Sequence, residues 1–190
     1  LIDEGAAYLA VATLTEALEL KAANMSWPVF IMGHTPDRLL HHVVDKDITQ
    51  TIFSFEQAEL LNELSGKADK RTKVHIKVDT GFHRLGKVPS DDFADEVCRI
   101  NELPDLEVEG IFTHLALTGD AENEEQFRLF TDFVSLLEDR GCSFRYKHLA
   151  DSIACVDFPD YRLNMIRPGA LIYGMVGYHM LIFMSGIERI

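Results

Sequence analysis

Short apolar runs alternate with segments of helical periodicity along most of this chain, and the alternation limits the folds that it can adopt. The runs are typical of buried strands, and the segments between them carry apolar residues three or four positions apart. Strand-like runs cover residues 7–12, 27–33, 48–54, 73–79, 106–116, 144–152 and 163–174. Because no hairpin turn signal joins two of them, the pattern predicts a parallel sheet covered by helices.

Helix signals lie between most of these runs. Thr13 and Glu16 have the spacing of a capping box before one helical segment, and Ser54 and Gln57 repeat that spacing before another. Residues 124–141 form the clearest helix, with Gly141 as its stop signal. Its apolar positions at helical spacing are Phe127, Phe130, Phe133 or Val134, and Leu137.

Two α/β architectures fit this order of elements, an open doubly wound sheet and a (β/α)8 barrel of the TIM type. No G-x-G-x-x-G sequence follows any strand-like run, which weakens the dinucleotide-binding form of the open sheet. Seven successive strand–helix units within residues 1–174 favour a barrel that is short of one strand.

Composition and charge exclude several classes of function. The chain is 47% hydrophobic and 26% charged, as in an ordinary globular protein with a substantial core. Its net charge of −13 argues against a nucleic-acid partner, which would need an excess of Lys and Arg. We find neither a membrane-spanning run nor a signal peptide, and three cysteines without a CxxC pair do not indicate a zinc site or a disulfide framework. These features predict a cytoplasmic protein with no membrane partner.

Unusual polar residues fall at the carboxyl ends of the strand-like runs, where barrels of this type carry their chemistry. Lys77 lies near the end of the fourth run and Arg84 in the loop after it, His114 ends the fifth, Ser152 ends the sixth, and Arg167 lies in the seventh. Each alone has a structural interpretation, such as an ion pair, a core histidine, a capping serine or a surface arginine. Their shared edge favours a ligand site.

The chemistry of this edge suits a phosphorylated, planar, anionic cofactor. The Ser152 hydroxyl and the backbone N–H groups around Gly169 and Ala170 could hold a phosphate. Arg84 and Arg167 supply fixed positive charge, and a histidine ring can stack on a flat ligand.

Three segments carry a resemblance to a known family. VHIKVDTGFHRLG, GIFTHLA and MIRPGALIYG, in this order and at these separations, resemble the barrel domain of alanine racemase. AYLAVATLTEALELKAA and PVFIMGHT are similar to its early strands and helix, so the resemblance covers roughly residues 1–178. It implies an enzyme that uses pyridoxal 5'-phosphate (PLP), built from a (β/α)8 barrel and a C-terminal β-domain.

The resemblance also implies roles for the cationic residues. Arg84 would hydrogen-bond near the phenolic oxygen of PLP and the substrate carboxylate, and Lys77, carbamylated in many members, would orient it. Arg167 would face the pyridine nitrogen. A permanent cation at that place disfavours protonation of the nitrogen, which restrains side reactions such as transamination.

The remaining cofactor contacts are implied in the same way. His114 would pack against the pyridine ring, and Ser152, Gly169 and Ala170 would hold the phosphate. Asp151 stands where an asparagine is common in the family, which places an additional carboxylate near that phosphate.

The implied activity is interconversion of L- and D-alanine by proton transfer between two bases, supplying D-alanine for cell-wall peptidoglycan. In the family one base is a lysine at the end of the first strand, and the other is a tyrosine from the β-domain of the partner subunit in a homodimer. We expect this chain to lack both. Residues 1–177 are then a partial barrel, residues 178–190 are a possible lead into the β-domain, and the chain alone is expected to be inactive.

Three other functions fit parts of the pattern. A racemase for serine, lysine or ornithine would have the same fold. A non-catalytic PLP-binding barrel would lack the β-domain, but KVDTG…RLG fits it poorly. An unrelated barrel that binds a sugar phosphate would need only the phosphate site.

Overall fold

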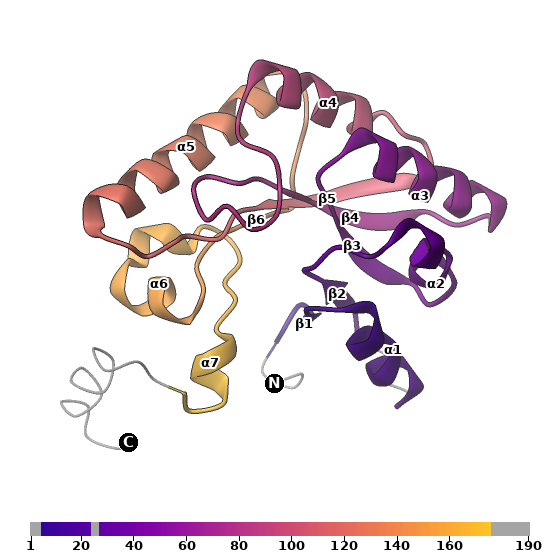
Figure 1. Ribbon diagram of the computed structural model, residues 1–190, viewed down its shortest axis with the longest axis horizontal. Helices are drawn as coiled ribbons and strands as arrows, with labels where there is room; N and C mark the ends of the chain where they lie inside the picture. Colours follow the sequence, from indigo (N-terminus) through magenta and orange to yellow (C-terminus); the bar gives the residue numbers. More distant parts are fainter. Residues whose placement is uncertain (1–4, 24–26, 176–190) are drawn as a thin grey trace.

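The computed structural model describes residues 5–23 and 27–175, and within them a single parallel sheet organises the fold. Its strands follow one another in chain order, each paired in parallel with the next. They are β1 (Leu9–Val11), β2 (Val29–Ile31), β3 (Ile48–Ile52), β4 (Thr72–Lys77), β5 (Leu106–Phe112) and β6 (Tyr146–His148). The sheet curves into an open half-barrel, so the prediction of a partial TIM-type barrel is confirmed (Figure 1).

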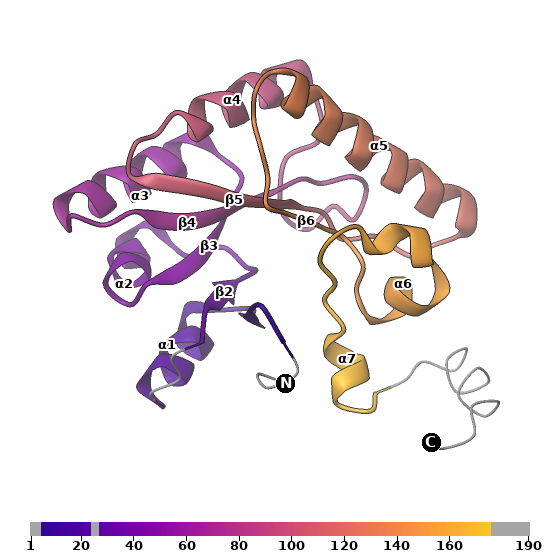
Figure 2. The ribbon, with the colours of Figure 1, turned by 180° about the vertical axis from the view of Figure 1, so that it is seen from behind.

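Helices cover the outer face of this curved sheet, and a second, smaller group follows β6 (Figures 1 and 2). The outer group is α1 (Leu14–Ala22), the 3-10 helix η1 (Asp37–Leu39), α2 (Leu40–Asp45), α3 (Phe55–Lys67), α4 (Asp91–Asn101) and α5 (Asp120–Asp139). The second group is α6 (Ser152–Asp157), the 3-10 helix η2 (Pro159–Arg162) and α7 (Gly169–Ile172). None of the helices within the described ranges is long and apolar enough to span a bilayer.

One of the two expected capping boxes is complete. The Thr13 side chain accepts from the Glu16 amide, and the Glu16 carboxylate accepts from the Thr13 amide at 2.8 Å. Ser54 likewise accepts from the Gln57 amide. The Gln57 side chain, however, donates to the Thr35 carbonyl at 3.1 Å, so this second box is only half formed.

The core lies between the outer helices and the sheet. Every residue of β2 and β3 is buried, as expected for parallel strands with both faces covered. Helix α5 contributes Phe130, Phe133, Val134 and Leu137 to this core. The Phe133 ring stacks on Phe93 of α4 at a centroid distance of 5.4 Å, which packs the two helices together.

The predicted seventh strand over residues 163–174 was wrong. Only Met165 forms a bridge to β6, and residues 169–172 are the helix α7. Leu163 has a φ of +49°, outside the extended region, and Pro168 has no N–H to donate to a ladder. The expected lead into a β-domain, residues 178–190, lies outside the described residues.

Phe130 should contribute more to stability than any neighbouring aromatic that is only partly covered. Phe130→Ala is expected to lower the free energy of unfolding by about 3–5 kcal/mol, because its fully buried ring would leave a cavity. Phe127→Ala, three residues earlier on the same helix and partly buried, is the matched control and should cost less. Urea denaturation measures both, and equal losses would contradict this assignment of the core.

Candidate functional site

A cavity of about 940 Å³ opens at the side of the half-barrel that lies between β1 and the segment after β6. Five of the predicted site residues line it: His114, Ser152, Arg167, Gly169 and Ala170. Apolar and aromatic side chains from the first two strands and from the residue after β2 complete the wall, among them Leu9, Val11, Phe30 and Met32. The strand ends therefore bring together most of the residues that the sequence indicated.

Arg167 is held in place by neutral acceptors. Its Nη1 donates to His148 Nδ1 at 2.7 Å, and its Nη2 donates to the carbonyl oxygens of Thr113 and Leu149 at 2.9 and 2.8 Å. Burial lowers the pKa of Arg167 to about 10, and the charge of Asp151 opposes this shift. Arg167 therefore stays a cation at neutral pH, and no carboxylate within the described ranges forms an ion pair with it.

His114 lies beside this guanidinium as a neutral ring. Its Nδ1 is 3.4 Å from Arg167 Nη2, and burial together with the charge of Arg167 lowers its pKa to about 4. The ring meets Phe82 edge to face, with centroids 4.8 Å apart. An uncharged imidazole at the wall of the cavity is suited to packing against a flat ligand.

Lys77 ends β4 and is almost fully buried. Its Nζ donates to the Val78 carbonyl at 2.5 Å. Burial and the nearby charges of Arg167 and Arg84 together lower the pKa of Lys77 to about 8, although the charge of Asp79 opposes the shift. A larger fraction of this amine is therefore neutral near pH 7 than for an exposed lysine.

The loop after β4 has a fixed shape. Asp79 Oδ1 accepts from the amides of Gly81 and His83 at 3.1 and 3.0 Å. Gly81 has a φ of +138° and Gly86 a φ of +105°, and a Cβ on Gly86 would lie 2.9 Å from the Lys77 carbonyl oxygen. The loop therefore needs glycine at both positions and Asp79 at its start.

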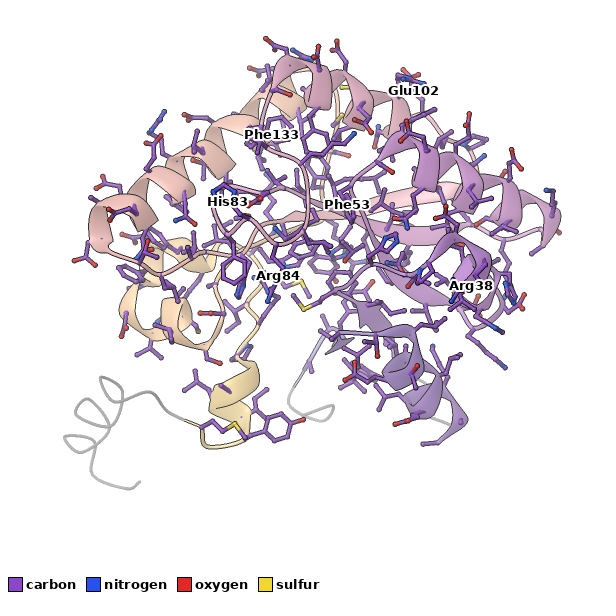
Figure 3. The ribbon with its side chains drawn as sticks, viewed as in Figure 1. Arg38, Phe53, His83, Arg84, Glu102 and Phe133 are labelled. Atoms are coloured by element: carbon purple, nitrogen blue, oxygen red, sulfur yellow. The ribbon has the colours of Figure 1, made fainter. Side chains whose placement is uncertain are left out.

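This loop presents Arg84 on the same side as His114. The Arg84 guanidinium lies over the Phe82 ring, 4.4 Å from its centroid, and Phe82 in turn contacts His114. Figure 3 shows Arg84 in this loop, facing the opening of the half-barrel. Lys77 and Arg84 do not themselves line the cavity, and Phe82 is a connecting residue that the sequence did not single out.

The residues predicted to bind a phosphate offer two hydrogen-bond donors. Ser152 Oγ accepts from the Leu171 amide at 3.2 Å, so its hydroxyl hydrogen can be donated elsewhere. Within the described ranges the Ala170 amide has no acceptor, whereas the Gly169 amide donates to the Arg167 carbonyl at 2.8 Å. Ser152 and Ala170 are therefore better placed than the Gly169 amide to bind an anion.

Asp151 has a local structural role. It is the N-cap of α6, and its Oδ1 accepts from the amides of Ile153 and Ala154, both at 3.0 Å. The carboxylate is therefore turned toward its own helix. Together, a fixed cation with no carboxylate partner in the described part of the chain, a neutral imidazole, a hydroxyl and an amide fit a flat, phosphorylated, anionic ring such as PLP.

A polar cluster beneath Arg167 was missed from the sequence. His148 Nε2 lies 2.9 Å from His75 Nδ1, and the Glu109 carboxylate accepts from Lys73 Nζ at 2.7 Å and from the Tyr8 hydroxyl. Burial opposes ionisation of Glu109, but its contacts with His75, Lys73 and Tyr8 lower its pKa to about 2. The two-residue spacing of His75 and Lys77, which places both on one face of β4, was the available signal.

Because of Glu109, the free energy of unfolding should fall as the solution becomes acidic. Its pKa is lower in the folded protein than its ordinary value of 4.5, so its contribution is complete above pH 4.5 and is lost as the pH falls toward 2. Glu109→Gln should therefore unfold more easily at pH 7 and lose less stability between pH 5 and pH 3. Denaturation at several pH values measures both effects. Glu107→Gln, at a half-buried position on the same strand, should leave the acid dependence of the wild type unchanged, and an identical profile for the two variants would contradict the prediction.

Comparisons with known proteins identify the family. The family model described as alanine racemase, N-terminal domain, matches residues 1–176. An alanine racemase of Methanococcus maripaludis is 41% identical over 180 residues, which are 92% of this chain and 48% of that protein. One from Clostridium tetani is 36% identical over 177 residues, covering 92% of this chain and 46% of that protein.

Solved structures give the same result. An alanine racemase of Clostridium difficile 630 superposes with a TM-score of 0.89 at 31% identity, over 94% of this chain and 49% of that chain. The Bacillus anthracis alanine racemase with bound L-Ala-P has a TM-score of 0.86 at 28% identity, over 96% of this chain and 48% of that chain. The chain spans about half the length of the curated relatives it matches. The barrel, the ordered rim residues and these matches together show that the chain belongs to the alanine racemase family and carries its N-terminal domain.

Proposed function

We propose that the protein containing this chain is a PLP-dependent alanine racemase that interconverts L- and D-alanine. The observation that carries the proposal is Arg167, a buried cation at the cavity wall whose hydrogen-bond acceptors among the described residues are all neutral. In a cytoplasmic homodimer of the family type, the product D-alanine would serve peptidoglycan synthesis. We expect the chain alone to be inactive.

Arg167 would control the electronic state of the cofactor. PLP, when bound, withdraws electrons from the α-carbon of the amino acid and so makes its α-proton acidic. Arg167 at the pyridine nitrogen would keep that nitrogen unprotonated, because two cations would otherwise be in contact. It would thereby limit electron withdrawal and favour return of the proton to the α-carbon over transamination.

Arg84 and Lys77 would hold the substrate end. The exposed guanidinium of Arg84 is free to form charge-assisted hydrogen bonds with a carboxylate and with a phenolic oxygen. The low pKa of Lys77 supports its carbamylation, since that reaction requires the neutral amine. A carbamate at Lys77 would be an anion near Arg84 and would orient it.

Ser152 and Ala170 would bind the phosphate through the hydroxyl hydrogen and the amide, neither of which has an acceptor among the described residues, with the backbone of Gly169 next to them. His114 would lie against the pyridine ring as a neutral imidazole. These contacts position the ring and exclude water from one side of it, and they leave proton transfer to other groups.

Replacing Arg84 should weaken substrate use selectively. Arg84→Ala is expected to lower kcat/KM for alanine roughly 10- to 100-fold, because a charge-assisted hydrogen bond contributes about 1.5–3 kcal/mol. Steady-state kinetics in the full-length enzyme measure this loss. Arg38→Ala, an exposed arginine on η1 away from the cavity, is the control and should change nothing. If Arg84→Ala left kcat and KM intact, Arg84 would not bind the carboxylate.

Reversing the charge at Arg167 should change the reaction outcome. In Arg167→Glu the new carboxylate would stabilise a proton on the pyridine nitrogen, so the spectrum of bound PLP should change and pyruvate should be released from L-alanine. Absorbance and a pyruvate assay measure these effects. If the spectrum of Arg167→Glu were unchanged and no pyruvate formed, Arg167 would not be the partner of the ring nitrogen. If the wild type bound PLP but did not racemise alanine, a non-catalytic PLP-binding barrel would be favoured instead.

A further inference from the structure

A line of buried polar side chains runs through the half-barrel from Arg167 to Glu109. Arg167 Nη1 is 2.7 Å from His148 Nδ1, and His148 Nε2 is 2.9 Å from His75 Nδ1. His75 Nε2 forms no hydrogen bond within the described residues, but it lies 3.7 Å from Glu109 Oε2, so this last contact is electrostatic. Both histidines are fully buried, so this line is shielded from solvent along its middle.

The two ends of the line impose one direction on its protons. A guanidinium only donates, so His148 Nδ1 must accept, and the proton of this neutral ring must be on Nε2. That proton is donated to His75 Nδ1, which leaves the His75 proton on Nε2, facing Glu109. An ionised carboxylate only accepts, so both ends favour the same tautomer of both rings. Burial lowers the pKa of each histidine and keeps both neutral.

The backbone of β5 is built around this arrangement. Val74 pairs with Val108 and His75 pairs with Gly110, so Glu109 is the extra residue of a β-bulge. A Cβ on Gly110 would lie 2.6 Å from His75 Nδ1, which means that the buried His75 ring occupies the space of that side chain. The bulge and the glycine together let the imidazole and the carboxylate approach each other.

We propose that Glu109 and His75 are positioning residues for Arg167. The carboxylate favours the His75 tautomer that carries its proton on Nε2, and this tautomer leaves His148 Nδ1 as an acceptor that fixes the guanidinium. Two neutral rings separate the anion from the cation, so Arg167 is oriented without a carboxylate beside it. The benefit to a bound pyridine ring rests on the proposed function, whereas the order of protons does not.

The test is a measurement of histidine tautomers by nitrogen-15 NMR in the full chain without PLP, with signals assigned from His75→Gln and His148→Gln variants. Protonated and unprotonated ring nitrogens have well-separated shifts, and the wild type should show Nε2–H on both rings. Arg167→Gln places an amide that can donate or accept at one end, so Glu109 alone should still maintain this single tautomer. In Arg167→Gln/Glu109→Gln neither end is directional, and a second tautomer should appear.

Glu107→Gln combined with Arg167→Gln is the matched control, because Glu107 is the half-buried glutamate two residues earlier on β5, and it should retain the single tautomer. Three results would overturn the proposal: Nδ1–H on His148 in the wild type, a mixture already in Arg167→Gln, or one unchanged tautomer in Arg167→Gln/Glu109→Gln.

Glu109→Gln alone gives a second measurement that does not require a double variant to fold. The proton on His75 Nε2 should shift upfield when it loses the carboxylate, and an unchanged resonance would also overturn the proposal. If PLP did not bind but the tautomers were as expected, only the proposed racemase function would be contradicted. The positioning role of Glu109 and His75 can therefore be tested separately from that function.

Discussion

Parallel pairing of the strands in chain order is the constraint on which the rest of this structure depends. It places the carboxyl ends of β4, β5 and β6 at one rim, so that the loop after β4, His114 and the segment around Arg167 meet there. No single segment of the chain contains these groups. They form a site only because the strands between them share one direction and one register.

Positive charge gathers at this rim although the chain is strongly acidic overall. Lys77, Arg84 and Arg167 each influence the electrostatics of His114, and all of them lower its pKa. Most of the acidic residues lie on exposed helical surface instead, where salt bridges such as Arg128 with Glu125 contribute little. The net charge of −13 therefore describes the outer surface, and the rim is a local exception suited to an anionic ligand.

The alternation of strands and helices could be predicted from the sequence because each element has its own hydrophobic periodicity. Helix α5, the β4 run and the rim residues all followed from local patterns and from the rule that parallel strands end at one edge. The prediction of a strand over residues 163–174 was wrong, and the reason is also local. Its apolar content resembled a strand, but Leu163, Pro168 and the start of α7 at Gly169 leave room for only one bridge to β6.

The sequence by itself determined the order of the elements, the parallel sheet and the candidate residues at the strand ends. The tertiary structure alone decided which polar groups face one another: Phe82 between Arg84 and His114, and the line from Arg167 through His148 and His75 to Glu109. These contacts join β4, β5, β6 and the segment after β6. Such pairs depend on strand register and on a one-residue bulge, which change the direction of a side chain without any local sequence signal that marks its partner.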